Sequence, residues 1–73
     1  MNDPFLAYDA RTHALLDRRV VEAEIAITEQ RLRIDRLTML GISTIDAEAF
    51  LADLERYAAK TIEDRQRFLD RQE

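Results

Sequence analysis

Apolar residues in the first half of the chain recur at alternating steps of four and three. They form a seam of Leu16, Val20, Ala23, Ile27, Gln30, Ile34 and Leu37. This heptad spacing is typical of a helix that packs lengthwise against another helix. Gln30 is the polar exception, and a single polar residue in such a seam is expected to fix the register of the paired helices.

A second apolar set runs along the same stretch of chain. It consists of Ala14, Val21, Ile25, Thr28, Leu32 and Met39. At about 100° per residue this set lies on the opposite side of the helix from the seam. One neighbouring helix covers only one of the two faces, and an exposed apolar stripe usually marks an interface. We therefore predict that these six residues form an oligomer interface, while the seam, which is longer and more regular, is favoured as the face that meets the second helix.

Residues 45–72 carry one apolar stripe, as in an amphipathic helix with a single buried face. Arg65 falls within this stripe, and we expect its charged end to reach water. The apolar positions are Ala47, Phe50, Leu51, Leu54, Tyr57, Ala58, Ile62, Phe68 and Leu69.

Start and stop signals divide the chain into two helices. Asp3 followed by Pro4 is a helix start, because the carboxylate accepts an orphan N–H and proline has none to lose. Gly41 can adopt the left-handed conformation that ends a helix, with Ile42 folding back on Leu37. The prediction is a single domain over residues 1–73, with helices over residues 4–40 and 45–72 and a turn at residues 41–44.

The turn predicts how the helices pair. Ser43 or Thr44 caps the second helix, and Asp46 and Glu48 suit the positive end of its dipole. A linker of about four residues forces antiparallel packing, so that residues whose numbers sum to about 85 lie side by side. We expect Leu16 near Phe68 or Leu69, Ile27 near Ala58, and Ile34 near Phe50 or Leu51.

The first helix is predicted to be longer than the second, about 55 Å against about 42 Å. The first roughly nine residues, with Phe5, Leu6 and Tyr8, then overhang the second helix. A change of direction near Asp9 or Thr12, both capping residue types, would let this segment fold back.

Length and composition also point to a partner. A chain of 73 residues buries only about 60% of the surface that its unfolded form exposes. Cysteine is absent, so no disulfide supports the fold, and a partner subunit is the remaining support. We predict an all-α antiparallel two-helix hairpin that dimerises into a four-helix bundle.

The charge pattern narrows the function. Charged residues make up 36% of the chain, the net charge is −4, and acidic and basic residues are interspersed. The chain has no block of basic residues, which argues against a general nucleic-acid binder. It also has no run of about 18 apolar residues that could span a membrane. The first residues lack the pattern of a signal peptide. The expected location is therefore the cytoplasm, with the protein itself as main partner and an unidentified protein as a further one.

Candidate chemistry is sparse. His13 lacks the basic, glycine-containing segment that follows the histidine in four-helix phosphotransfer modules, so we interpret it as a half-exposed residue at the rim of the seam. No Glu-x-x-His motif accompanies the carboxylates of residues 9–29, as a di-metal bundle requires. We assign no catalytic, cofactor or metal residue, expect no enzyme, and predict ion pairs of Glu29 with Arg33, Arg31 with Asp35, and Glu63 with Arg67.

Ten of the eleven basic residues are arginine, which favours phosphate recognition. An RNA- or DNA-binding hairpin dimer, like the plasmid copy-number regulator Rop, is therefore the alternative function. The main prediction is a non-enzymatic interaction or regulatory module, because Arg31, Arg33 and Arg36 alternate with acidic residues rather than forming one basic patch.

Residues 20–58 resemble a group of small alphaproteobacterial helical-hairpin proteins. The resemblance is carried by Glu24, Ile27, Gln30-Arg31, Ile34, Leu37, Gly41, Thr44, Ala47-Glu48, Leu51 and Leu54. Ile62 departs from the pattern, in which a histidine is expected. The group has no established activity, so the resemblance implies a bacterial helical hairpin and leaves the function open.

Overall fold

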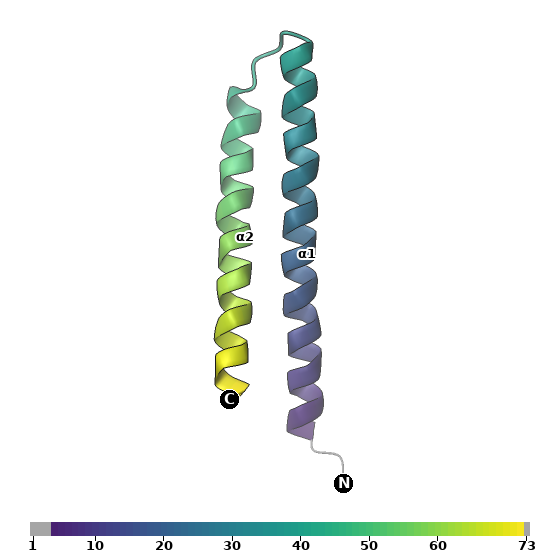
Figure 1. Ribbon diagram of the computed structural model, residues 1–73, viewed down its shortest axis with the longest axis vertical. Helices are drawn as coiled ribbons and strands as arrows, with labels where there is room; N and C mark the ends of the chain where they lie inside the picture. The colour runs from purple at the N-terminus through teal and green to yellow at the C-terminus, as the bar shows by residue number, and fades with distance from the viewer. Residues whose placement is uncertain (1–3, 73) are drawn as a thin grey trace.

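The computed structural model describes residues 4–72, with side chains for residues 10–71. It contains two helices, α1 (Pro4–Met39) and α2 (Ile45–Gln72), and no strand within these residues. The helices lie side by side and run in opposite directions (Figure 1). The all-α antiparallel hairpin predicted from the sequence is confirmed.

A glycine ends α1 as predicted. Gly41 has a φ of 71°, a backbone conformation that side chains bearing a Cβ rarely adopt. The N–H of Ile42 donates to the Leu37 carbonyl at 2.9 Å, and the N–H of Gly41 donates to the Thr38 carbonyl at 3.1 Å. These two bonds are the Schellman arrangement, which satisfies carbonyls that would otherwise lack partners at the helix end.

Thr44 occupies the N-cap position of α2. Its carbonyl accepts the N–H of Glu48 at 2.8 Å, the first helical bond of α2. The hydroxyl of Ser43 accepts the N–H of Ile45 at 3.4 Å. Asp46 and Glu48 lie in the first turn of α2, where negative charge stabilises the helix.

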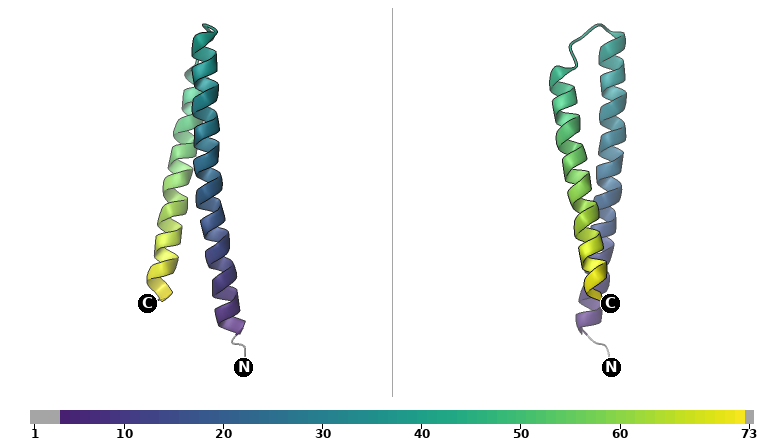
Figure 2. Two further views of the ribbon diagram at one scale, coloured as in Figure 1. Left: turned by 45° about the vertical axis from the view of Figure 1, so that its right-hand side comes forward. Right: turned by 60° about the vertical axis from the view of Figure 1, so that its left-hand side comes forward.

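The seam of α1 faces α2. Leu16, Val20, Ala23 and Gln30 are buried, while Ile27, Ile34 and Leu37 are half-buried. The two turned views show that the helices cross slightly rather than run strictly parallel (Figure 2), which is usual for paired helices. The core is therefore one narrow line of side chains between two helices.

The buried line of α2 differs from the predicted stripe. Phe50, Tyr57 and Ile62 are about half-exposed, whereas Thr61 is buried and its hydroxyl donates to the Ala58 carbonyl at 2.7 Å. The prediction was wrong for the three large residues because they flank the heptad line instead of lying on it. The line itself, all buried or half-buried, is Ala47, Leu51, Leu54, Ala58, Thr61, Arg65 and Phe68.

The register lies about one helical turn from the predicted one. Phe68 was expected beside Leu16, but its ring packs against His13, with ring centroids 6.1 Å apart. Asp17 accepts from Arg65, at 3.5 Å between Oδ1 and Nη1. The linker causes the shift, because after the end of α1 it runs back along the hairpin, and α2 begins below that end (Figure 1).

The first helix is unbroken. α1 runs without a break from Pro4 to Met39, so the prediction of a change of direction near Asp9 or Thr12 was wrong. Its first turns extend beyond the end of α2 (Figure 1), as the overhang prediction required. The Asp3 cap and the side chains of Phe5, Leu6 and Tyr8 lie outside the described residues.

Candidate interaction surface

The six residues predicted as an oligomer interface are all exposed and lie on one side of α1, with Arg18 and Asp35 at the two heptad positions between them. We call the face made by Ala14, Val21, Ile25, Thr28, Leu32 and Met39 the outer face. Val21 and Ile25 are each 52% exposed, Leu32 is 55% exposed and Met39 is 86% exposed. Because the buried seam occupies the opposite side of α1, the outer face points away from α2, and α2 cannot cover it.

Thr28 adds little polarity to the centre of the outer face. Its hydroxyl donates to the Glu24 carbonyl one turn earlier, at 3.1 Å. The donor is therefore satisfied within α1. A shallow depression of about 250 Å³ lies here, lined by Val21, Glu24, Ile25, Thr28 and Glu29.

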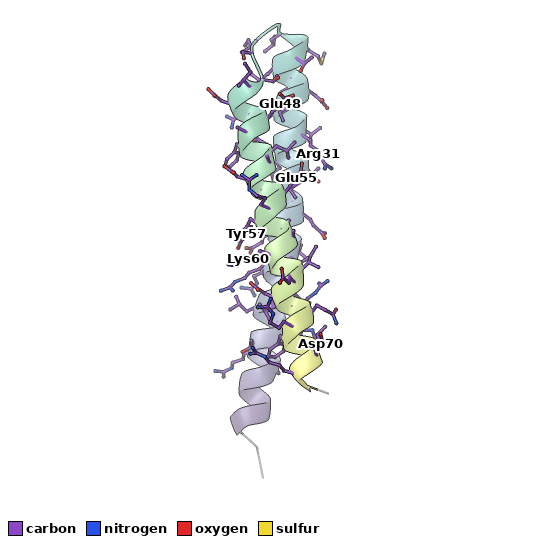
Figure 3. All side chains as sticks on the ribbon, turned by 90° about the vertical axis from the view of Figure 1, so that its left-hand side faces the viewer. Arg31, Glu48, Glu55, Tyr57, Lys60 and Asp70 are labelled. Carbon is purple, nitrogen blue, oxygen red and sulfur yellow. The ribbon has the colours of Figure 1, made fainter. Side chains whose placement is uncertain are left out.

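The charges beside the outer face are mostly unpaired. Arg31 approaches Glu55 of α2 at 3.9 Å, on the edge of the hairpin opposite to Tyr57 (Figure 3). The described residues form no ion pair of Arg31 with Asp35 or of Glu29 with Arg33, so these two predictions were wrong, whereas Glu63 and Arg67 do pair, at 2.6 Å. Among the described residues, the structure gives no ion-pair partner to Glu22, Glu24, Glu29, Arg33 or Arg36.

Gln30 is buried beside a groove between the helices. It is 6% exposed, and its Nε2 donates to the Ala47 carbonyl of α2 at 2.9 Å. This contact holds the start of α2 against α1. The predicted register placed Gln30 beside Glu55, whereas the observed register brings the first turns of α2 to Gln30. The groove, of about 530 Å³, is lined by Ala26, Glu29, Gln30, Leu32, Arg33, Arg36, Phe50 and Leu54.

His13, Asp17 and Arg65 form a small polar cluster near the end of the hairpin that lies away from the turn. The Asp17 carboxylate lies 3.5 Å from both His13 Nε2 and Arg65 Nη1. His13 is half-exposed at the rim of the seam, as interpreted from the sequence. Arg65 lies on the buried line of α2 and carries its guanidinium outward to Asp17. The cluster joins the two helices far from the turn.

The residues missed from the sequence had a visible signal. Thr61 continues the steps of four and three that run from Ala47 to Phe68 along α2. An assignment based on this spacing alone, without regard to polarity, would have predicted that Thr61 is buried. The bond from Gln30 to Ala47 had no such signal, because it depends on where the linker places α2.

The described residues show no other assembled site. No three side chains of His, Asp or Glu gather closely enough in this part of the chain to hold a metal ion. Neither α1 nor α2, so far as described, combines the length and apolarity needed to cross a membrane. No protein family, curated protein or solved structure matches the chain. The resemblance to alphaproteobacterial hairpin proteins therefore stays a prediction.

Proposed function

We propose that this protein is a non-enzymatic interaction or regulatory module of the bacterial cytoplasm that works as a homo-oligomer, joined through the outer face of α1. The observation that carries the proposal is the exposure of Val21, Ile25, Leu32 and Met39 along one side of α1. Large contiguous apolar surfaces on small proteins usually mark interfaces.

The slenderness of the hairpin core supports this proposal. Among the described residues, the buried apolar side chains are Leu16, Val20, Ala23 and Ala58, and no side chain is both large and completely buried. Two of these four are alanines, which bury little apolar area. A second copy on the outer face adds apolar burial that α2 cannot supply, and small folds commonly gain stability in this way.

The experiment introduces charge into the outer face. Ile25→Glu combined with Leu32→Glu places two carboxylates per copy in the proposed interface, where an unpaired charge is costly. Light scattering at micromolar concentration should give at least twice the chain mass of 8.6 kDa for the unmodified protein. The variant should fall to the mass of one chain while its circular dichroism stays helical.

A matched control adds the same charges elsewhere. Ile45→Glu with Ile62→Glu changes two exposed isoleucines of α2, which do not belong to the outer face. This control should keep the mass of the unmodified protein. Equal dissociation of both variants, or a folded monomer of the unmodified chain, would contradict the proposal.

A further inference from the structure

The charged residues that flank the outer face at seven-residue spacing run from acidic to basic along α1. One edge carries Glu22 and, fourteen residues later, Arg36. The other edge carries Glu24 and, seven residues later, Arg31. In both pairs the acidic residue precedes Thr28 and the basic residue follows it. Glu29, midway between Glu22 and Arg36 on the first edge, is acidic and follows Thr28.

We infer that two copies meet through their outer faces in antiparallel orientation, with the two-fold axis passing near Thr28. This pairing rests on the self-association proposed above. It places Glu22 of one copy near Arg36 of the other and Glu24 near Arg31, which gives four opposite-charge pairs by symmetry, against one like-charge pair of Glu29 with Glu29 of the other copy near the axis. A parallel pairing in register would instead bring the two different edges together, with Glu24 of one copy near Glu29 of the other and Arg31 near Arg36, and these like charges repel.

The apolar residues fit the same axis. Ile25 precedes Thr28 by three residues and Leu32 follows it by four, so each Ile25 meets the Leu32 of the other copy. The depression of about 250 Å³ beside Val21, Ile25 and Thr28 lies where that Leu32 arrives. Thr28 itself is suited to the axis, because its hydroxyl is already bonded to Glu24 and brings no unsatisfied donor into the contact.

The edge charges are free to take part. Glu22, Glu24 and Arg36 have no ion-pair partner among the described residues. Arg31 is held only loosely, since it lies 3.9 Å from Glu55 and its side chain is 63% exposed. Pairs at the rim of an interface add little affinity but select orientation.

The pairing defines the shape of the dimer. The seam and the outer face lie on opposite sides of α1, so the helices follow the order α2, α1, α1 of the second copy, α2 of the second copy. This is an open layer of four helices. A closed four-helix bundle would instead use an edge of the hairpin, such as the edge bearing the half-exposed Phe50 and Tyr57.

Single cysteines test the orientation, because the chain has none of its own. Thr28→Cys, Ile25→Cys, Leu32→Cys and Tyr57→Cys are each oxidised gently in the folded protein, and the disulfide-linked dimer is measured. We expect Thr28→Cys to link to itself with the highest yield. Ile25→Cys and Leu32→Cys should link poorly alone and several times better when the two are mixed.

The other outcomes separate the possible failures. Strong self-linking of both Ile25→Cys and Leu32→Cys means a parallel pairing, and the highest yield at Tyr57→Cys means a closed bundle. Either result overturns the inference but keeps the homo-oligomer. A chain that is monomeric by light scattering overturns the proposed function itself.

A charge exchange provides a second measurement. Glu22→Arg or Arg36→Glu alone places like charges together at two sites of the dimer and should raise its dissociation constant by roughly fivefold. The two substitutions together restore opposite charges and should restore the affinity. Failure of the double variant to recover would contradict the antiparallel alignment.

Discussion

The seam and the outer face of α1 are built alike but meet different surroundings. Both follow heptad spacing, both are mainly aliphatic, and each has one polar residue near its middle, Gln30 in the seam and Thr28 in the outer face. The contrast is sharpest at two adjacent valines: Val20 is 4% exposed and Val21 is 52% exposed. Heptad spacing thus identifies apolar surfaces that suit packing against another helix. The hairpin has only one other helix, α2, so it covers the seam and leaves the outer face exposed.

Gln30 of the seam and Thr28 of the outer face form hydrogen bonds to different helices. Gln30 reaches across to the Ala47 carbonyl of α2, so it ties one helix to the other. Thr28 turns back to the Glu24 carbonyl of its own helix, which leaves the outer face without an unsatisfied hydroxyl donor at its centre. The seam is thereby specific for one register of α2, and the outer face stays open to a partner.

The largest effect is expected at the adjacent valines. Val20→Asp buries a carboxylate in the seam and should destabilise the hairpin by at least about 3 kcal/mol, with loss of helical circular dichroism. Val21→Asp makes the same change one residue later, on the outer face. It should keep the helical signal and weaken self-association by roughly tenfold, so each variant is the control for the other.

Gln30→Leu should stabilise the hairpin by about 1 kcal/mol. The substitution removes a buried amide and adds apolar area, and the Ala47 carbonyl lies within α2, where it can keep a helical bond. Urea unfolding measures the change, and Gln66→Leu, at an exposed position of α2, should have little effect. A less stable Gln30→Leu hairpin would show that the amide contributes more to stability than to register.

The smallest effect is expected at Thr28. Thr28→Val replaces the hydroxyl with a methyl group and should tighten self-association by roughly threefold through added apolar burial. Thr38→Val is the matched control, because Thr38 makes the same kind of bond to the Ile34 carbonyl, at 2.9 Å, but lies outside the outer face. Sedimentation measures the self-association of both variants. If Thr28→Val associates no more tightly than the unmodified protein, the contact lies elsewhere.

Local signals in the sequence predicted the turn well. Gly41, Ser43-Thr44 and the acids at 46 and 48 act through bonds within a few residues, and each appears where the sequence placed it. Helix lengths followed for the same reason. The outer face could also be predicted, since its position depends only on the geometry of α1.

Longer-range details could not be predicted from the same signals. The register depends on the path of residues 40–44, and a shift of one turn exchanged the expected neighbours of Gln30 and Phe68. Phe50 and Tyr57 were assigned to the apolar stripe of the second helix, yet both are about half-exposed because they lie beside the heptad line. Arg31 pairs with Glu55 of α2 rather than with Asp35. Spacing within one helix does not predict an ion pair between two helices.

The most direct measurement compares the methyl groups of the two faces as the protein is diluted. Relaxation by a soluble paramagnetic probe reports which methyl groups meet solvent. If the outer face joins two copies, Ile25 and Leu32 are protected at high concentration and become exposed on dilution, while Val20 of the seam stays protected throughout. Exposure of Ile25 and Leu32 at every concentration, with Val20 still protected, would show that the outer face has no second copy upon it.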